Sequence, residues 1–208
     1  MNRHQLCKVL RAAAMETGLT DLVVVGSQAV LGTHEDWLLP TEATRSNEAD
    51  VAVDIATAQA SEGTDETALA DQIDGAIGEG SHFHQTFGYY GQGVETATAT
   101  LTTGWRERLV PLVCHDRDGE TVNAVGWCLE IQDLWLSKAA AGRPKDLEYC
   151  LALARDGLVD LDEIHRRANE LREPERTRAA AMLTTAAREL RGSGWDGDLD
   201  ELRGSQSE

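Results

Sequence analysis

The stretch of sequence that decides the fold is Glu48-Ala49-Asp50-Val51-Ala52-Val53-Asp54-Ile55. Apolar residues occupy every odd position, and acids occupy three of the four even positions. Because successive side chains of a β-strand point to opposite faces, this alternation predicts a strand with one packed face. Glu48, Asp50 and Asp54 are then expected to share the other face.

A strand, a turn and a helix are predicted immediately before this octet. Leu22 to Val25 is a β-branched run typical of a buried strand, and helical spacing resumes from Ser27 to Leu31 after Gly26. A helix that starts at a Gly-Ser turn offers backbone N–H groups and a hydroxyl to phosphate oxygens. An ordinary strand-to-helix turn with an N-cap serine has the same pattern, so both interpretations stay open.

The remaining segments predict an α+β fold, in which helices flank a mixed β-sheet and the C-terminal third is helical. The expected helices are 3–17, 65–77, 131–141, 144–155, 161–171 and 175–191, and the further expected strands are 87–94, 96–101, 108–115 and 121–128. We expect an α/β core at residues 1–130, a helical part packed on it at 131–191, and a disordered acidic tail at 192–208.

Two carboxylates two residues apart on an otherwise apolar strand repel one another unless a cation neutralises them. Mg²⁺ prefers oxygen ligands and is usually held by one or two carboxylates together with substrate phosphates. Glu48 and Asp50 are therefore candidate metal ligands. A solvated edge face in an acidic protein would show the same alternation.

Two separated segments carry a family resemblance. Val24-Val25-Gly26-Ser27-Gln28-Ala29, followed by Asn47-Glu48-Ala49-Asp50-Val51, resembles the h-G-(G/S) … (D/E)-h-(D/E)-h signature of the nucleotidyltransferase superfamily. Lys138-Ala139-Ala140-Ala141-Gly142-Arg143-Pro144-Lys145-Asp146 is similar to the K-x-x-A-x-R-x-K-D block of minimal nucleotidyltransferase-like proteins of prokaryotes, which include AbiEii-type toxins. The stretches 83–90 and 104–109 resemble an uncharacterised branch of this group, so the likeness covers about residues 20 to 165.

The resemblance implies a nucleotidyltransferase-like fold that uses Mg²⁺ and a nucleoside triphosphate. If the chain is an active enzyme, it transfers a nucleoside monophosphate to an RNA, protein or small-molecule acceptor. The AbiEii-type branch further implies a toxin of a toxin–antitoxin system, with an antitoxin as partner.

The resemblance also implies a role for each matching residue. Glu48 and Asp50 would hold one or two metal ions and align the acceptor, and Gly26 and Ser27 would contact the triphosphate. The remaining site residues come from the second block: Lys138 and Asp146 as catalytic residues, and Arg143 and Lys145 as phosphate-binding residues.

A third carboxylate completes the metal site in active members of the superfamily. The candidates in this sequence are Asp54, Asp116 and Glu130, and none lies in the middle of a predicted strand. The alternative to an enzyme is therefore a catalytically degenerate nucleotidyltransferase fold that acts as a nucleotide-binding or protein-binding module.

The charge balance narrows the range of partners. The chain has 36 acidic residues against 19 Lys and Arg, a formal net charge of −17, which disfavours indiscriminate attachment to nucleic acid or anionic membranes. No DNA-binding motif is present, and no apolar run approaches the roughly 20 residues of a membrane span, so we expect a cytoplasmic protein. An RNA acceptor would require a basic patch, for which the candidates are Arg106, Arg108, Arg166, Arg167 and Arg172.

Several other residues are expected to be structural. The four scattered cysteines, Cys7, Cys114, Cys128 and Cys150, are interpreted as buried thiols because no CxxC pair occurs. His82 and His84 would share one strand face, but no third ligand at a suitable spacing follows, so they do not predict a zinc site. Tyr89 and Tyr90 are expected to pack within the sheet.

Overall fold

The computed structural model of the chain describes residues 1–59, 63, 65–116, 118–119 and 122–192. It forms two compact units, the first comprising Met1–Ala99 with Gly104–Glu130 and the second Thr100–Thr103 with Ile131–Glu208. The chain thus crosses between the units three times. The predicted disordered tail, apart from Gly192, lies outside the described residues.

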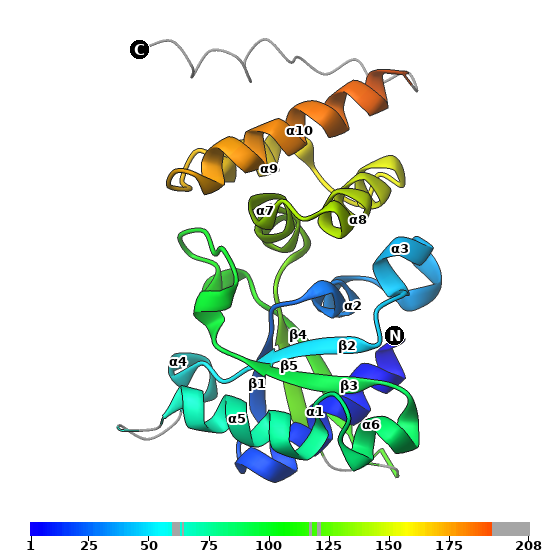
Figure 1. Cartoon of the computed structure of the whole chain (residues 1–208), viewed down its shortest axis with the longest axis vertical. Coiled ribbons are helices and arrows are strands. Elements are labelled where there is room, and N and C mark those ends of the chain that lie inside the picture. The colour runs from blue at the N-terminus through cyan, green and yellow to red at the C-terminus, as the bar shows by residue number, and fades with distance from the viewer. Residues whose placement is uncertain (60–62, 64, 117, 120–121, 193–208) are drawn as a thin grey trace. The chain divides into compact units, whose positions relative to one another are not determined.

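The first unit contains a mixed β-sheet, which has five strands in the described part of the chain (Figure 1). The strands are β1 (Asp21–Val24), β2 (Glu48–Ala52), β3 (Tyr90–Val94), β4 (Val110–His115) and β5 (Val122–Cys128), in the spatial order β3-β2-β1-β5-β4. β1 pairs antiparallel with β2 and parallel with β5, whereas β2–β3 is parallel and β4–β5 is antiparallel. The predicted α+β class with a mixed sheet is confirmed.

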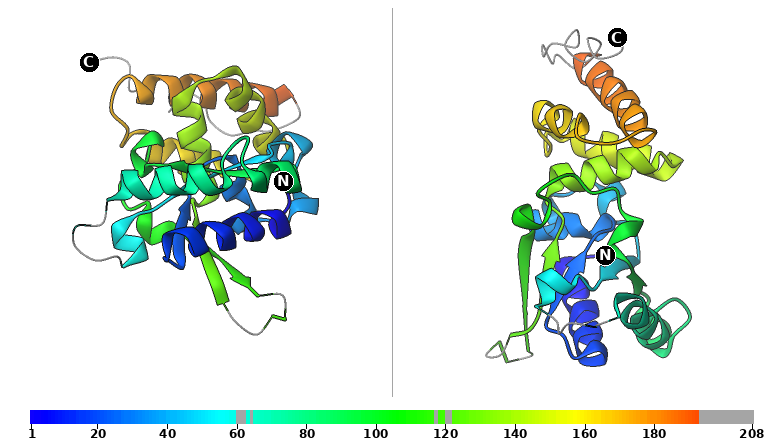
Figure 2. Two further views of the ribbon diagram at one scale, coloured as in Figure 1. Left: turned by 60° about the horizontal axis from the view of Figure 1, so that its bottom comes forward. Right: turned by 90° about the vertical axis from the view of Figure 1, so that its left-hand side faces the viewer.

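Helices α1 and α5 run side by side along one face of this sheet (Figure 2). Both helices pack closely against the sheet because glycines in the strands leave room for the helix side chains. A Cβ on Gly126 of β5 would lie 2.5 Å from Leu10 of α1, and one on Gly91 of β3 would lie 2.7 Å from Ile77 of α5. The α-helices of this unit are α1 (Arg3–Thr17), α2 (Val30–Thr33), α3 (Thr41–Thr44), α4 (Ile55–Ala58), α5 (Glu66–Ile77) and α6 (His82–Phe87).

Strand β2 follows the predicted alternation up to Ala52. Ala49 and Val51 are fully buried on the packed face, while Glu48 and Asp50 are only partly buried. The strand ends earlier than predicted, because Asp54 caps helix α4 by accepting a hydrogen bond from the Thr57 N–H at 2.9 Å. Asp54 is therefore a helix cap rather than the third acid of a strand face.

Two other segments differ from the sequence prediction. The predicted strand 96–101 is wrong, since Thr96–Thr98 forms a 3₁₀ turn. His82 and His84 lie on helix α6, not on a strand. Ser81 caps this helix by accepting from the His84 N–H at 3.1 Å, and Gly88 ends it with a φ of 76°, a left-handed conformation that favours glycine.

The cysteine prediction is half wrong. Cys7 of α1 and Cys114 of β4 form a disulfide that joins residues 107 positions apart, with Cα atoms 5.3 Å apart. Cys128 and Cys150 are buried free thiols, as predicted. Burial raises the pKa of the Cys128 thiol to about 12, so it stays protonated.

The second unit is helical and comprises α7 (Ile131–Ala141), α8 (Pro144–Arg155), α9 (Leu161–Ala168) and α10 (Glu175–Gly192). The predicted helical C-terminal third is therefore confirmed. The fully buried Trp135 donates its indole N–H to the Cys150 carbonyl oxygen at 3.0 Å, which fixes α7 against α8. No helix in the described ranges is long and apolar enough to cross a membrane.

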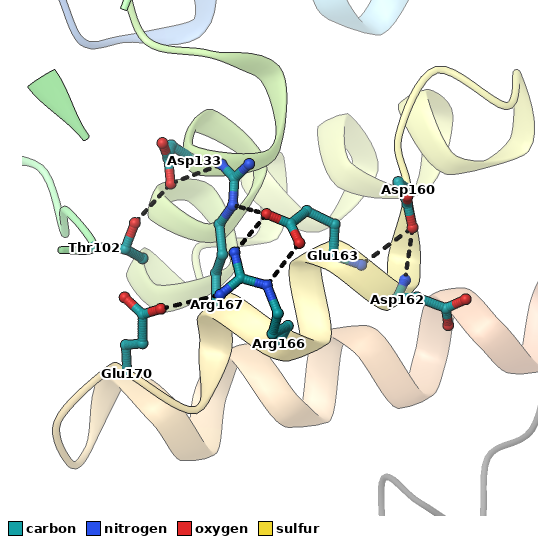
Figure 3. Close-up of polar contacts among 8 residues, drawn as sticks. All are labelled: Thr102, Asp133, Asp160, Asp162, Glu163, Arg166, Arg167 and Glu170. Atoms are coloured by element: carbon teal, nitrogen blue, oxygen red, sulfur yellow. Dashed lines mark hydrogen bonds and ion pairs between the residues drawn. The ribbon is translucent and has the colours of Figure 1, made fainter. Parts of the chain in front are cut away.

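A buried ion pair explains why Thr100–Thr103 belongs to this helical unit (Figure 3). The Thr102 hydroxyl donates to Asp133 Oδ1 at 2.7 Å, and Arg167 Nη1 lies 3.1 Å from the same oxygen. Arg167 also donates to Glu163 at 2.6 Å. Because Asp133 is 1% exposed, its charge depends on these partners, and the Thr102 segment is held where it supplies one.

Candidate functional site

The Gly-Ser turn and the acidic strand meet in the first unit. Val24 of β1 lies opposite Val51 of β2, and the Val25 N–H donates to the Asp50 carbonyl oxygen at 3.2 Å. A Cβ on Gly26 would lie 1.5 Å from Asp50 Oδ2 and 2.8 Å from Asp50 Cβ. Since the φ of Gly26 is −87°, which other residues adopt freely, glycine is required here by the Asp50 side chain.

Glu48 lies beside this contact and is held by a tyrosine. Tyr90 Oη donates to Glu48 Oε2 at 3.0 Å. Burial raises the pKa of Tyr90 to about 12, with further contributions from the Glu48 hydrogen bond and the charges of Glu48, Glu79 and Asp50. The phenol therefore remains a proton donor to Glu48. The sequence suggested only a packing role for Tyr90; parallel pairing of β2 with β3 places it opposite Glu48.

The predicted helix at 27–31 is present but is divided into two short helical pieces. Ser27–Ala29 forms a 3₁₀ turn, η1, and only Val30–Thr33 follows as helix α2. A helix this short provides little macrodipole for phosphate binding. Gln28, in the middle of η1, is fully buried, and neither its Oε1 nor its Nε2 has a hydrogen-bond partner within the described residues.

The first candidate for the third carboxylate, Asp54, is already neutralised. Arg106 donates to it from Nε at 3.0 Å and from Nη2 at 2.6 Å, and Thr57 donates from its hydroxyl at 2.7 Å. Burial alone would raise the pKa of Asp54, but these hydrogen bonds and the Arg106 charge outweigh burial and lower it. Arg106 is 52 residues away in the sequence, and no spacing pattern pairs the two.

The other two candidates differ in their distance from Gly26. Asp116 follows β4, which lies two strand positions from β1, or about 10 Å across the sheet, and whose last residue, His115, pairs with Val122 at the start of β5, at the edge opposite Gly26. Glu130 follows β5, whose Cys128 lies opposite Val24 and whose neighbour Leu129 donates its N–H to the Val24 carbonyl oxygen at 3.1 Å. Glu130 is therefore the candidate that the register brings to the edge where Gly26 lies.

The residues predicted from the second block lie in the helical unit, where three of them form a cluster. Lys138 Nζ lies 3.8 Å from Asp146 Oδ1, and Arg143 Nε donates to Asp146 Oδ2 at 2.6 Å. Lys138 and Asp146 are both buried, so the carboxylate balances the ammonium charge. Lys145 is exposed on α8.

The predicted site residues thus form two groups, each described within its own unit. Gly26, after β1, comes together with Asp50 on β2, which also carries Glu48, whereas Lys138 of α7 and Asp146 of α8 come together with Arg143, which precedes α8. Within the described residues, no group of three or more His, Cys, Asp or Glu side chains is placed to hold a metal ion.

Comparison with known proteins gives one match. The profile of a family described as "Nucleotidyltransferase of unknown function (DUF6036)" matches residues 4–189. No curated protein and no solved structure matches the chain. The matched range contains Gly26, Glu48 and Asp50 as well as the block from Lys138 to Asp146. The chain therefore belongs to the DUF6036 family of nucleotidyltransferases of unknown function.

Proposed function

We propose that this protein is a Mg²⁺-dependent nucleotidyltransferase that transfers a nucleoside monophosphate from a nucleoside triphosphate to an acceptor. The family supports the reaction class. The observation that carries the proposal is the contact between Gly26 and the Asp50 carboxylate, with Glu48 two residues away on the same strand face.

The donor set on β2 fits a magnesium ion. Two carboxylates provide the oxygen ligands that Mg²⁺ prefers, and substrate phosphates and water complete its coordination in such sites. Glu48 is held by a neutral phenol, in contrast to Asp54, which pairs with a guanidinium. When bound, the metal ion would stabilise the negative charge on the phosphates.

The residues of the chain would position the reacting groups. Tyr90 holds one Glu48 oxygen and leaves the other for a ligand, and the missing side chain of Gly26 leaves space for Asp50. In the reaction, the acceptor oxygen bonds to the α-phosphorus while the bond from that phosphorus to the bridging oxygen breaks. Pyrophosphate leaves, and Asp50 is the proposed residue that takes the acceptor proton.

A second proposed phosphate-binding group lies within the helical unit. Arg143 donates to Asp146 from both Nε and Nη2 while its side chain stays 55% exposed, and it and the exposed Lys145 are the proposed phosphate-binding residues of this unit. Lys138 and Asp146 would orient this group.

The pairing of the candidate arginines favours a protein or a small molecule over RNA as the acceptor. Arg106 pairs with Asp54, Arg166 with Glu163 and Glu170, and Arg167 with Glu163 and Asp133, so these three arginines bring no excess positive charge for an RNA backbone. A toxin role with an antitoxin partner remains part of the proposal through the AbiEii-like block.

One observation favours a second candidate function. The Asp54 carboxylate is occupied by Arg106 and Thr57, and Asp116 lies far across the sheet. If Glu130 does not complete the site, the protein would bind a nucleotide or a protein partner without transferring a nucleotide.

Nucleotide labelling separates the two functions. Purified protein is incubated with Mg²⁺, α-³²P-labelled nucleoside triphosphates, and either total RNA or cell extract. Label transfer that is lost in Glu48→Ala and Asp50→Ala but kept in Asp71→Asn supports the enzyme, because Asp71 is an exposed acid on α5. Metal-dependent nucleotide binding without transfer supports the binding module. Absence of both metal and nucleotide binding overturns the site.

A further inference from the structure

The side chain of Gln28 is buried without the hydrogen bonds that its amide requires. It is 0% exposed, and both Oε1 and Nε2 lack a partner within the described residues. Buried amides are normally hydrogen-bonded, because an unpaired donor or acceptor loses its water without compensation. A leucine or methionine would fill a similar volume without this penalty, so packing does not explain a glutamine here.

Several other buried polar side chains in the described part of the chain have hydrogen-bond partners. Asp54 is bonded to Arg106 and Thr57, and Asp133 is bonded to Thr102. Gln92, another glutamine of the first unit, donates from Nε2 to Asp74 at 2.7 Å. Gln28 differs from these residues, and its unpaired amide points to a partner that is not part of the described chain.

The position of Gln28 connects it with the proposed site. It lies in η1, which packs against β2, and it is two residues after Gly26. Gly26 in turn abuts the Asp50 carboxylate. A ligand bound at the Gly26–Asp50 contact would therefore lie within one helical turn of Gln28 along the chain.

The Gln28 side-chain amide has both a donor and an acceptor, and this indicates which part of a nucleotide it would bind. Phosphate oxygens at neutral pH are mainly acceptors, so they would satisfy Nε2 and leave Oε1 unpaired. A ribose hydroxyl both donates and accepts, and a base edge presents a donor beside an acceptor. Only the nucleoside part of a nucleotide offers partners for both amide atoms.

We propose that Gln28 is a specificity-determining residue that binds the nucleoside part of the substrate through its amide. This inference rests on the proposed function, since it requires a nucleotide at the Gly26–Asp50 contact. It adds a residue that neither the signature of the superfamily nor the family description assigns to a ligand.

The test compares two probes by isothermal titration calorimetry in Mg²⁺: a non-hydrolysable α,β-methylene nucleoside triphosphate and inorganic tripolyphosphate. In Gln28→Leu we expect the Kd for the nucleotide to rise about tenfold, the equivalent of roughly one lost hydrogen bond, while the Kd for tripolyphosphate stays unchanged. Ribo and 2′-deoxy analogues, and analogues with each of the four bases, then identify whether the ribose or the base is bound.

Stability separates this role from a structural one. Without ligand, Gln28→Leu should be at least as stable to urea as the wild type, because it removes an unpaired buried amide. Gln92→Leu is the matched control and should be less stable, because it removes the donor to Asp74 Oδ2. Gln28→Met serves the same purpose if the leucine variant does not fold.

If the wild type binds nucleotide, any one of three results overturns the inference and leaves the proposed function standing. The first is a marked loss of stability in both Gln28 variants. The others are an equal loss of affinity for nucleotide and tripolyphosphate in the Gln28 variant, or an unchanged affinity for both. If the wild type binds neither probe, the proposed function fails, and the inference fails with it. The wild-type titration therefore distinguishes the two failures.

Discussion

Replacing Gly26 with alanine tests the geometry of the site directly. The new Cβ would lie 1.5 Å from Asp50 Oδ2, 2.4 Å from its Cγ and 2.8 Å from its Cβ. The carboxylate can rotate away, but the Cβ contact is also too short, so strand β2 or the turn must shift. Overpacking of this kind usually costs about 1–3 kcal/mol of unfolding free energy, and we expect Gly26→Ala to fall in that range.

Urea denaturation followed by circular dichroism measures the effect. Gly75→Ala is the matched control, because Gly75 is exposed within helix α5 and a Cβ there meets nothing within 4 Å. That variant should gain up to about 1 kcal/mol from helix propensity. The two Gly→Ala changes are thus expected to have opposite signs.

A double-mutant cycle assigns the loss to Asp50. Asp50→Ala removes the two closest atoms, so combining it with Gly26→Ala should recover about 1 kcal/mol or more relative to additivity. Gly26→Ala should also abolish Mg²⁺-dependent nucleotide binding, since the carboxylate must move. Full wild-type stability in Gly26→Ala, or strict additivity in the cycle, would refute the close contact.

Three further predictions concern the rest of the fold. The lowered pKa of Asp54 means that its pairing with Arg106 stabilises the protein above the ordinary carboxyl value of 3.8 and that this contribution is lost as the pH falls through the lower folded-state value. Urea stability measured from roughly pH 5 to pH 2 should therefore fall less steeply in Asp54→Asn; equal slopes would contradict this. Reducing the disulfide between α1 and β4 should lower the unfolding free energy by up to about 4–5 kcal/mol, because it closes a loop of about a hundred residues; unchanged urea midpoints with and without dithiothreitol would refute it. Thr102→Val should cost about 1.5 kcal/mol by removing a hydrogen bond to the buried Asp133 charge, and an unchanged midpoint would show that Thr102 contributes nothing.

Local patterns predicted much of the secondary structure. The apolar spacing of residues 3–17 predicted helix α1 at its full length, and Pro144 marked the first residue of α8. Strict alternation in β2 placed Ala49 and Val51 in the core. These predictions succeeded because the period of the apolar residues reflects the geometry of one element and needs no information from the rest of the chain.

Cap residues mark the two element ends at which the structure differs from the predicted strands. Ser81 before His82 and Gly88 after Phe87 are the cap residues of a short helix, and they could have identified α6. Asp54 is predicted as a strand residue but is the N-cap of α4, where its side chain accepts a hydrogen bond from the N–H of Thr57, three residues later. In both cases the side chain that ends the element carried the information.

The sequence by itself predicted two segments that match the family signature: a Gly-Ser turn before an acidic strand, and a basic block with Asp146 in the helical third. Only the tertiary structure decided which distant residues pair, because pairing depends on distance in space. It joined Arg106 to Asp54 and Cys7 to Cys114 across 52 and 107 residues. It also left Gln28 buried with no hydrogen-bond partner among the residues that the structure describes, which no pattern of residue types can show, because a glutamine is polar in any sequence and unsatisfied only in a particular fold.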